Sequence, residues 1–253
     1  LVLLFLTLSS FFDFNQNNEK DKLLIEIISY VIERGHFDPK NIDNEFSENM
    51  FKEFIENMDG QHRFFLSSDI GNFKKYKYDL DDQIINSKTT FFDLVYNKLI
   101  QRQEIVKNFY EEILNKPFSF NEDEIISLDY KNAPYPTTLN DLKFLWRKRL
   151  KLSTLSIYVD KKEDQINQKK IDSSYAILDD YILEKQSREI TLSNMKNFFD
   201  SVDELNRNDY FNIYINSLVK QFDPHSFYFS PNEKETFDTS ISGKFEGIGA
   251  RLG

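Results

Sequence analysis

Apolar residues recur every three or four positions along most of this chain, which is the spacing that places them on one face of an α-helix. A first predicted helix ends at Gly35. A second has Ser47 as its predicted N-cap and Gly60 at its C-terminal end, and a third starts at Asp69. The apolar faces of these three helices are Leu24, Ile27, Ile28, Val31 and Ile32, then Met50, Phe51, Phe54, Ile55 and Met58, then Ile70, Phe73, Tyr76 and Leu80.

The same period continues through the rest of the chain to the proline at position 224. A long helix is predicted from Thr90 to Leu114, since Pro117 cannot continue it. The predicted irregular segments are 118–138, which holds Pro134 and Pro136, and 160–170, a charged solvated linker. Further helices are predicted at 139–158, 169–184, 192–205 and 209–222. Trp146 shares the apolar pattern of Leu142, Leu145 and Leu150, so we expect it inside. From Ser240 onward the pattern changes to strand and loop.

Composition supports a folded, mainly α protein. Aromatic residues make up 15% of the chain, with 25 Phe, which excludes a disordered chain. With only 7 Gly and 6 Pro, an all-β sandwich with many tight turns is disfavoured. The net charge of −10 would repel a phosphate backbone, so neither DNA nor another nucleic acid is an expected partner. The one basic block (Arg147, Lys148, Arg149 and Lys151) lies on a helical pattern, and we interpret it as a solvated helix face.

The N-terminal residues indicate export. The chain starts with an apolar run from Leu1 to Phe12, followed by polar residues from Asp13 to Lys22. This run is too short to span a bilayer as a helix, but it fits the apolar region of a secretory signal. We therefore expect a clipped signal peptide at residues 1–14. The alternative is that the run is a buried helix or strand.

No arrangement of polar residues indicates a metal, a cofactor or a catalytic site. There is no cysteine, and the histidines (His36, His62 and His225) lack a second ligand at helical spacing. His225 and Ser226 are neighbours in the sequence, but adjacent residues rarely place a base in attacking geometry beside a hydroxyl. The segment from Asp223 to Ser226 is better interpreted as a turn, because Asp and Pro both favour one.

The last residues form a glycine loop that suits a carboxylate. Gly247, Ile248, Gly249 and Ala250 follow Phe245 and Glu246 in a pattern typical of a loop entering a strand. Glycines let the backbone take positive φ and aim successive N–H groups at one point, as in domains that bind the C-terminus of a peptide. Close packing is an equally good explanation from these residues alone. A nucleotide site is disfavoured, since no βαβ unit surrounds the glycines.

Five blocks in order resemble the tail-specific (carboxy-terminal processing) proteases. They are Arg34 to Lys40 with Asp43 to Ser47, Met58 to Gly60 with Phe64 to Ile70, Leu145 to Lys151, Phe222 to Ser226 with Tyr228 to Pro231, and Phe245 to Ala250. The resemblance implies a helical N-terminal domain at residues 20–232 and the first strand of a truncated PDZ domain at residues 240–253. It implies that the backbone from Gly247 to Ala250 binds the C-terminus of a substrate.

The same resemblance implies an exported, periplasmic serine endopeptidase, with a Ser–Lys dyad in a protease core that these 253 residues do not include. No catalytic residue is therefore expected here. The implied partners are protein substrates, bound through nonpolar C-terminal ends, and a periplasmic adaptor protein is a candidate second partner. Association with the inner membrane is compatible with this location. The alternatives are a stand-alone helical interaction module and a small hydrolase that uses Ser226 and His225.

Overall fold

The computed structural model describes residues 2–35, 40–231, 234, 237–238 and 241, with side chains from residue 19 onward. The described part is mainly α, as predicted, and no β-strand occurs within it. The elements are α1 (Val2–Gly35), α2 (Asn44–Asp59), α3 (Ser67–Phe73), the 3-10 turn η1 (Lys74–Tyr76), α4 (Leu80–Ile85), α5 (Thr90–Leu114), α6 (Leu139–Ile171), α7 (Asp180–Glu204) and α8 (Arg207–Val219). The predicted PDZ strand falls almost wholly outside the described residues.

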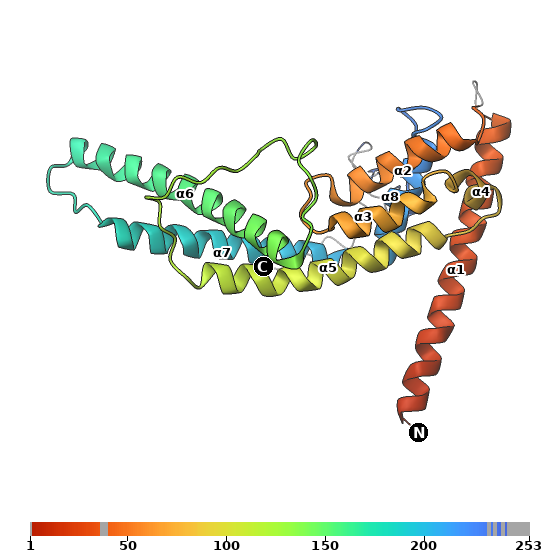
Figure 1. Cartoon of the computed structure of the whole chain (residues 1–253), viewed down its shortest axis with the longest axis horizontal. Coiled ribbons are helices and arrows are strands. Elements are labelled where there is room, and N and C mark those ends of the chain that lie inside the picture. The colour runs from red at the N-terminus through yellow and green to blue at the C-terminus, as the bar shows by residue number, and fades with distance from the viewer. Residues whose placement is uncertain (1, 36–39, 232–233, 235–236, 239–240, 242–253) are drawn as a thin grey trace.

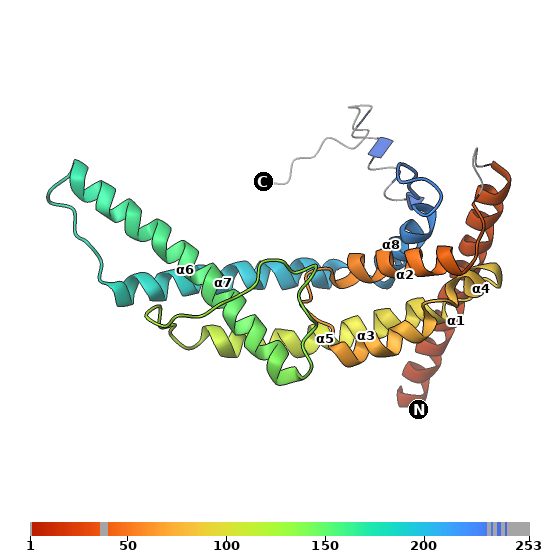
Figure 2. The same ribbon diagram turned by 45° about the horizontal axis from the view of Figure 1, so that its top comes forward.

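The molecule is elongated, with α1 at one end and the α6–α7 hairpin at the other (Figure 1). The long helix α5 connects the two ends: it packs against α3 and α8 toward its N-terminal end and against α6 and α7 toward its C-terminal end. After a turn of 45° the outer ends of α6 and α7 are seen to diverge, and the first half of α1 projects from the body (Figure 2). Within the described residues, no helix combines the length and the apolar character needed to cross a bilayer.

Phenylalanines form much of the core where α2, α5 and α8 meet. The rings of Phe54 and Tyr214 lie 5.0 Å apart at 78°, and those of Phe92 and Phe211 lie 4.9 Å apart at 73°. Such edge-to-face pairs add to the free energy gained by burying the rings themselves. The many Phe residues of the sequence are thus explained largely by helix packing.

Two helices begin at residues other than those predicted. The N-cap of α2 is Asp43, whose carboxylate accepts hydrogen bonds from the N–H groups of Glu45 and Phe46. Ser47 is buried instead, and its hydroxyl is 2.7 Å from both the carboxylate and the N–H of Asp81, so it joins α2 to α4. The predicted third helix begins at Ser67 and is broken into α3, η1 and α4.

The α6–α7 hairpin corrects two further predictions. The predicted linker 160–170 is the helical outer part of α6, and the two helices predicted at 169–184 and 192–205 are replaced by the single helix α7. Polar contacts stabilise both regions. Gln165 is buried and pairs with the backbone N–H and carbonyl of Leu178. The hydroxyl of Thr154 on α6 lies 3.0 Å from that of Thr191 on α7.

Candidate functional site

The turn after α2 is organised by the buried carboxylate of Asp59. It accepts hydrogen bonds from three backbone N–H groups, those of Arg63 at 2.7 Å, Phe64 at 3.0 Å and Phe65 at 2.8 Å. Burial raises the pKa of Asp59 to about 6, although the three N–H groups act in the opposite direction. Asp59, which belongs to one of the five blocks that resemble the protease family, therefore has a structural role that the sequence did not reveal.

The next residues are fixed by a close approach and a buried ion pair. A Cβ on Gly60 would lie 2.5 Å from the carbonyl oxygen of Glu56, so any other residue there would require the backbone to shift. Asp69 binds the guanidinium of Arg102 through two bonds of 2.8 and 3.0 Å and accepts a third from the N–H of Leu66. This pair joins α3 to α5.

Trp146 is buried, as predicted. Only 3% of its surface is exposed, and its indole N–H donates to the carbonyl of Arg63 at 2.7 Å. The centre of its ring lies 6.2 Å from that of Phe64 and 6.3 Å from that of Phe199. Trp146 therefore packs α6 against both the turn after α2 and the helix α7.

The prediction that the basic block is a solvated helix face is wrong. Arg147 and Lys151 both bind the carboxylate of Glu124, the latter at 2.6 Å, and the side chain of Lys151 is only 9% exposed. Lys148 donates to the carbonyl of Ile125 at 2.8 Å. The basic block holds the irregular segment 115–138 against α6, which explains why so many cations lie on one helix of an acidic chain.

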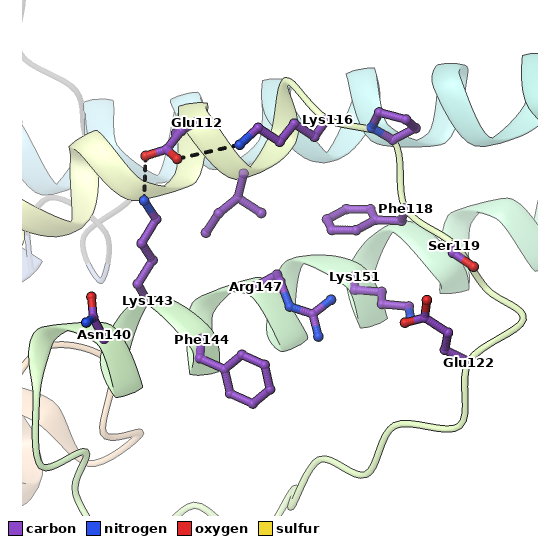
Figure 3. A pocket seen from close by; sticks show the side chains of 12 residues that line it. Glu112, Lys116, Phe118, Ser119, Glu122, Asn140, Lys143, Phe144, Arg147 and Lys151 are labelled. Atoms are coloured by element: carbon purple, nitrogen blue, oxygen red, sulfur yellow. Dashed lines mark hydrogen bonds and ion pairs between the residues drawn. The ribbon is translucent and has the colours of Figure 1, made fainter.

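A cavity of about 540 Å³ opens where the end of α5, the start of the irregular segment and the first half of α6 meet. Its lining residues are Glu112, Ile113, Lys116, Pro117, Phe118, Ser119, Glu122, Asn140, Lys143, Phe144, Arg147 and Lys151. Figure 3 shows Phe118 projecting from the segment after α5, with Arg147 on α6 near it in this view. We call this space the α5–α6 cavity.

Ion pairs form the rim of the α5–α6 cavity. Glu112 lies 2.5 Å from Lys143 and 3.7 Å from Lys116, so two ammonium groups share one carboxylate (Figure 3). The Lys143 ammonium holds the pKa of Glu112 below its usual range. On the other side, Arg147 and Lys151 share the carboxylate of Glu124. The cavity therefore combines apolar walls with incompletely neutralised cations.

The segment from Asp223 to Ser226 forms the predicted turn. The Asp223 carboxylate accepts hydrogen bonds from the N–H of His225 at 3.1 Å and from the hydroxyl of Ser226 at 2.9 Å. Because the Ser226 hydroxyl donates to Asp223 and not to the adjacent imidazole, this arrangement does not activate it as a nucleophile.

His62 does not lie in a metal site formed by described residues. The His62 ring stacks on Tyr135, with ring centres 3.6 Å apart, and burial lowers the pKa of its imidazole. Among the residues that the structure describes, no three His, Asp or Glu side chains lie close enough together to hold a metal ion. His36 lies outside the described residues.

The predicted carboxylate loop of Gly247, Ile248, Gly249 and Ala250 also lies outside the described residues, so this site stays a prediction. The predicted boundaries of the signal peptide (residues 1–14), the helical domain (20–232) and the start of the PDZ domain (240–253) also stay predictions. The helix α1 includes most of residues 1–14, whose side chains lie outside the description.

Comparison with known proteins identifies the helical part of the chain. The family model for the tail specific protease N-terminal domain matches residues 28–232. A tail-specific protease of Haemophilus influenzae is 27% identical over 237 residues, which cover 93% of this chain and 31% of that protein. The chain thus spans about a third of the length of this relative.

Proposed function

Because this chain belongs to the family of tail specific protease N-terminal domains, we propose that it is the non-catalytic front section of a serine endopeptidase. The complete enzyme degrades or processes proteins from their nonpolar C-termini, with a Ser–Lys dyad in a later domain. The family match over residues 28–232 is the observation that carries this proposal.

The role of this section is to scaffold the substrate cleft, while the loop from Gly247 to Ala250 starts the PDZ domain that binds the C-terminus. Its construction supports that role, because the buried pair of Asp69 and Arg102 and the hydrogen-bonded turn at Asp59 fix α2, α3 and α5 relative to one another. Groups held in this way keep a neighbouring site in one geometry.

The activity is tested by comparing this chain with the complete protein. We expect the 253-residue chain alone to cleave no peptide, since it lacks the dyad, and the complete protein to degrade an unfolded reporter with a nonpolar C-terminus. The measurement is loss of intact reporter on a gel. A complete protein that leaves the reporter intact contradicts the proposal, and cleavage by the 253-residue chain would revive His225 and Ser226 as candidates.

Export to the periplasm is part of the proposal and is supported by the apolar run from Leu1 to Phe12. The natural leader with about thirty following residues is fused to alkaline phosphatase, which is active only outside the cytoplasm. We expect activity from this fusion and none after two of the leader's leucines are replaced by arginine. No activity from the natural fusion would favour a buried helix instead.

A stand-alone helical interaction module is the second candidate. Exposed apolar side chains at the outer end of the α6–α7 hairpin favour it, such as Ile171 at 80% and Tyr181 at 70% exposure. The activity test separates the two candidates, because only the protease hypothesis predicts that the complete protein cleaves the reporter.

A further inference from the structure

Residues 123–129 form an extended stretch within the irregular segment. The chain runs through them without a turn or a bend. Exposure alternates along the stretch: Glu124 and Ile126 are half-buried, whereas Asp123 and Ile125 are exposed. Side chains that point to opposite faces in turn are typical of a β-strand. We call residues 123–129 the extended segment.

Contacts with α6 hold the extended segment in place. Glu124 binds Arg147 and Lys151 of α6. Ile126 lines a small cavity of about 100 Å³ together with Leu152 of α6. The segment is therefore ordered before any partner binds, which reduces the entropy that binding has to overcome.

One edge of the extended segment has backbone groups without a partner. In a strand, the N–H and C=O groups of successive residues point alternately to the two edges. On the edge of the odd-numbered residues, the carbonyl of Ile125 accepts a hydrogen bond from Lys148 of α6 at 2.8 Å. The other edge carries the backbone groups of Glu124, Ile126 and Leu128, which form no hydrogen bond within the described part of the chain. An unpaired strand edge is a template for another extended chain.

The exposed side chains of the extended segment indicate the chemistry of its partner. Ile125 is 87% exposed, more than any other large apolar side chain in the described part of the chain. Asp123 and Asp129, near the two ends, have no cationic partner among the described residues, since the ion pairs of this region use Glu124 and Glu56. A strand with an apolar centre and basic ends complements this pattern. A second copy of the same segment does not, because it would place carboxylates opposite one another.

From these observations we infer that the extended segment binds an internal stretch of an unfolded polypeptide, which adds to its free edge as a β-strand. Backbone hydrogen bonds supply the main interaction, as in other cases of strand addition, so no free C-terminus is required. The inference goes beyond the proposed protease and does not depend on it. Its test uses a peptide with blocked ends and no cleavage step, so a failure here leaves the activity test unaffected.

The probe is the heptapeptide lysine–threonine–valine–threonine–valine–threonine–lysine, acetylated at one end and amidated at the other. When its lysines lie opposite Asp123 and Asp129 in an antiparallel pair, a valine lies opposite Ile125 and the threonine N–H groups point to the free edge. The same peptide with glutamate in place of both lysines should bind about ten-fold more weakly, because two ion pairs are replaced by repulsion.

The measurement is an NMR titration of the 253-residue chain that follows backbone amide signals and their exchange with water. We expect the peptide to shift the signals of the extended segment. At saturation, exchange should slow for the N–H groups of Glu124, Ile126 and Leu128, and should stay unchanged for those of Ile125 and Ser127, because only the free edge is paired.

Two methylated forms of the peptide test the pairing directly and leave the protein unaltered. Methylation of two threonine nitrogens removes donors that face the free edge, so it should weaken binding at least about ten-fold, as the loss of two hydrogen bonds implies. Methylation of the two valine nitrogens changes the opposite edge of the peptide. It should therefore alter the affinity less than about three-fold.

Variants of the chain locate the site. Leu128→Pro removes one N–H group from the free edge and should weaken binding about ten-fold, whereas Ser127→Pro removes one from the opposite edge and should have little effect. Ile125→Ser should weaken binding about three-fold through the lost cross-strand contact. Ile171→Ser is its matched control, since Ile171 is 80% exposed but lies at the outer end of α6. It should change nothing.

The inference is overturned if the peptide does not shift the signals of the extended segment, if the two methylated peptides bind equally well, or if Leu128→Pro and Ser127→Pro have the same effect. Signals of this segment that move with protein concentration in the absence of peptide would also contradict it, because the edge would then pair with a second copy of the chain. A misfolded variant cannot mimic the difference between the methylated peptides, which is measured on the unaltered chain.

Discussion

Replacing Arg102 with Met is expected to lower the free energy of unfolding of this chain by about 3–5 kcal/mol. The side chain of Arg102 is 11% exposed and that of Asp69 is 5% exposed, and two hydrogen bonds join them. The substitution keeps an unbranched apolar stem but removes the guanidinium, which leaves the Asp69 carboxylate buried without a countercharge. The expected cost comes mainly from this unpaired carboxylate, because replacing both members of a buried ion pair costs far less than removing one.

Urea denaturation followed by circular dichroism measures the effect. The double variant Asp69→Asn/Arg102→Met should recover part of the loss, because the stranded charge is gone. Lys52→Met is the control, since Lys52 is 60% exposed and forms an i,i+4 pair with Glu48 that should contribute less than about 1 kcal/mol. If Arg102→Met and Lys52→Met are equally stable, the pair of Asp69 and Arg102 does not hold α3 against α5.

Asp59→Ala is expected to lower the free energy of unfolding by about 2–4 kcal/mol, because three backbone N–H groups lose their acceptor and those of Phe64 and Phe65 are buried. Asp59→Asn should be milder, as it keeps one acceptor oxygen. The measurement is again urea denaturation. Equal stability of the alanine variant and the wild type would mean that the turn finds other acceptors.

The same residue predicts a pH dependence. Burial raises the pKa of Asp59 to about 6 in the folded chain, from its ordinary value of 3.8. The folded carboxyl group thus binds its proton more tightly than the unfolded one, and its contribution to stability is full below about pH 4 and is lost as the pH rises through about 6. From pH 4 to 7 the wild type should lose about 2–3 kcal/mol relative to Asp59→Asn. A difference that does not change with pH contradicts the raised pKa.

Helices with a regular apolar face could be predicted from the sequence. The helix from Thr90 to Leu114 has the predicted bounds, and Trp146 is buried as its apolar neighbours indicated. The recurrence of apolar residues does not reveal a helix where the helix packs through small or polar side chains. Ser187 and Thr191 on α7 are fully buried, and Gln165 binds the backbone of Leu178. These stretches therefore lack the apolar pattern on which the prediction depends.

Only a few of the interactions around the α5–α6 cavity could be predicted from the sequence. Glu112 and Lys116 are spaced as an i,i+4 pair, and the acidic residues of segment 118–138 have the sign opposite to that of the basic block. Neither feature indicates that Glu124 pairs with Arg147, 23 residues later, because that contact depends on how the irregular segment crosses α6. Solvation of the basic block was therefore predicted incorrectly: the charges are visible in the sequence, but their partners are not.

We propose that this helical section belongs to a protease that recognises the C-terminal ends of its substrates, and this proposal is central. It is tested most directly by the rates at which the complete protein degrades two copies of one unfolded reporter, both ending in nonpolar residues, one as the free acid and one amidated. We predict that the free acid is degraded at least about ten-fold faster, because only its carboxylate gains charge-assisted hydrogen bonds. Equal rates, or degradation of neither reporter, would contradict the claim.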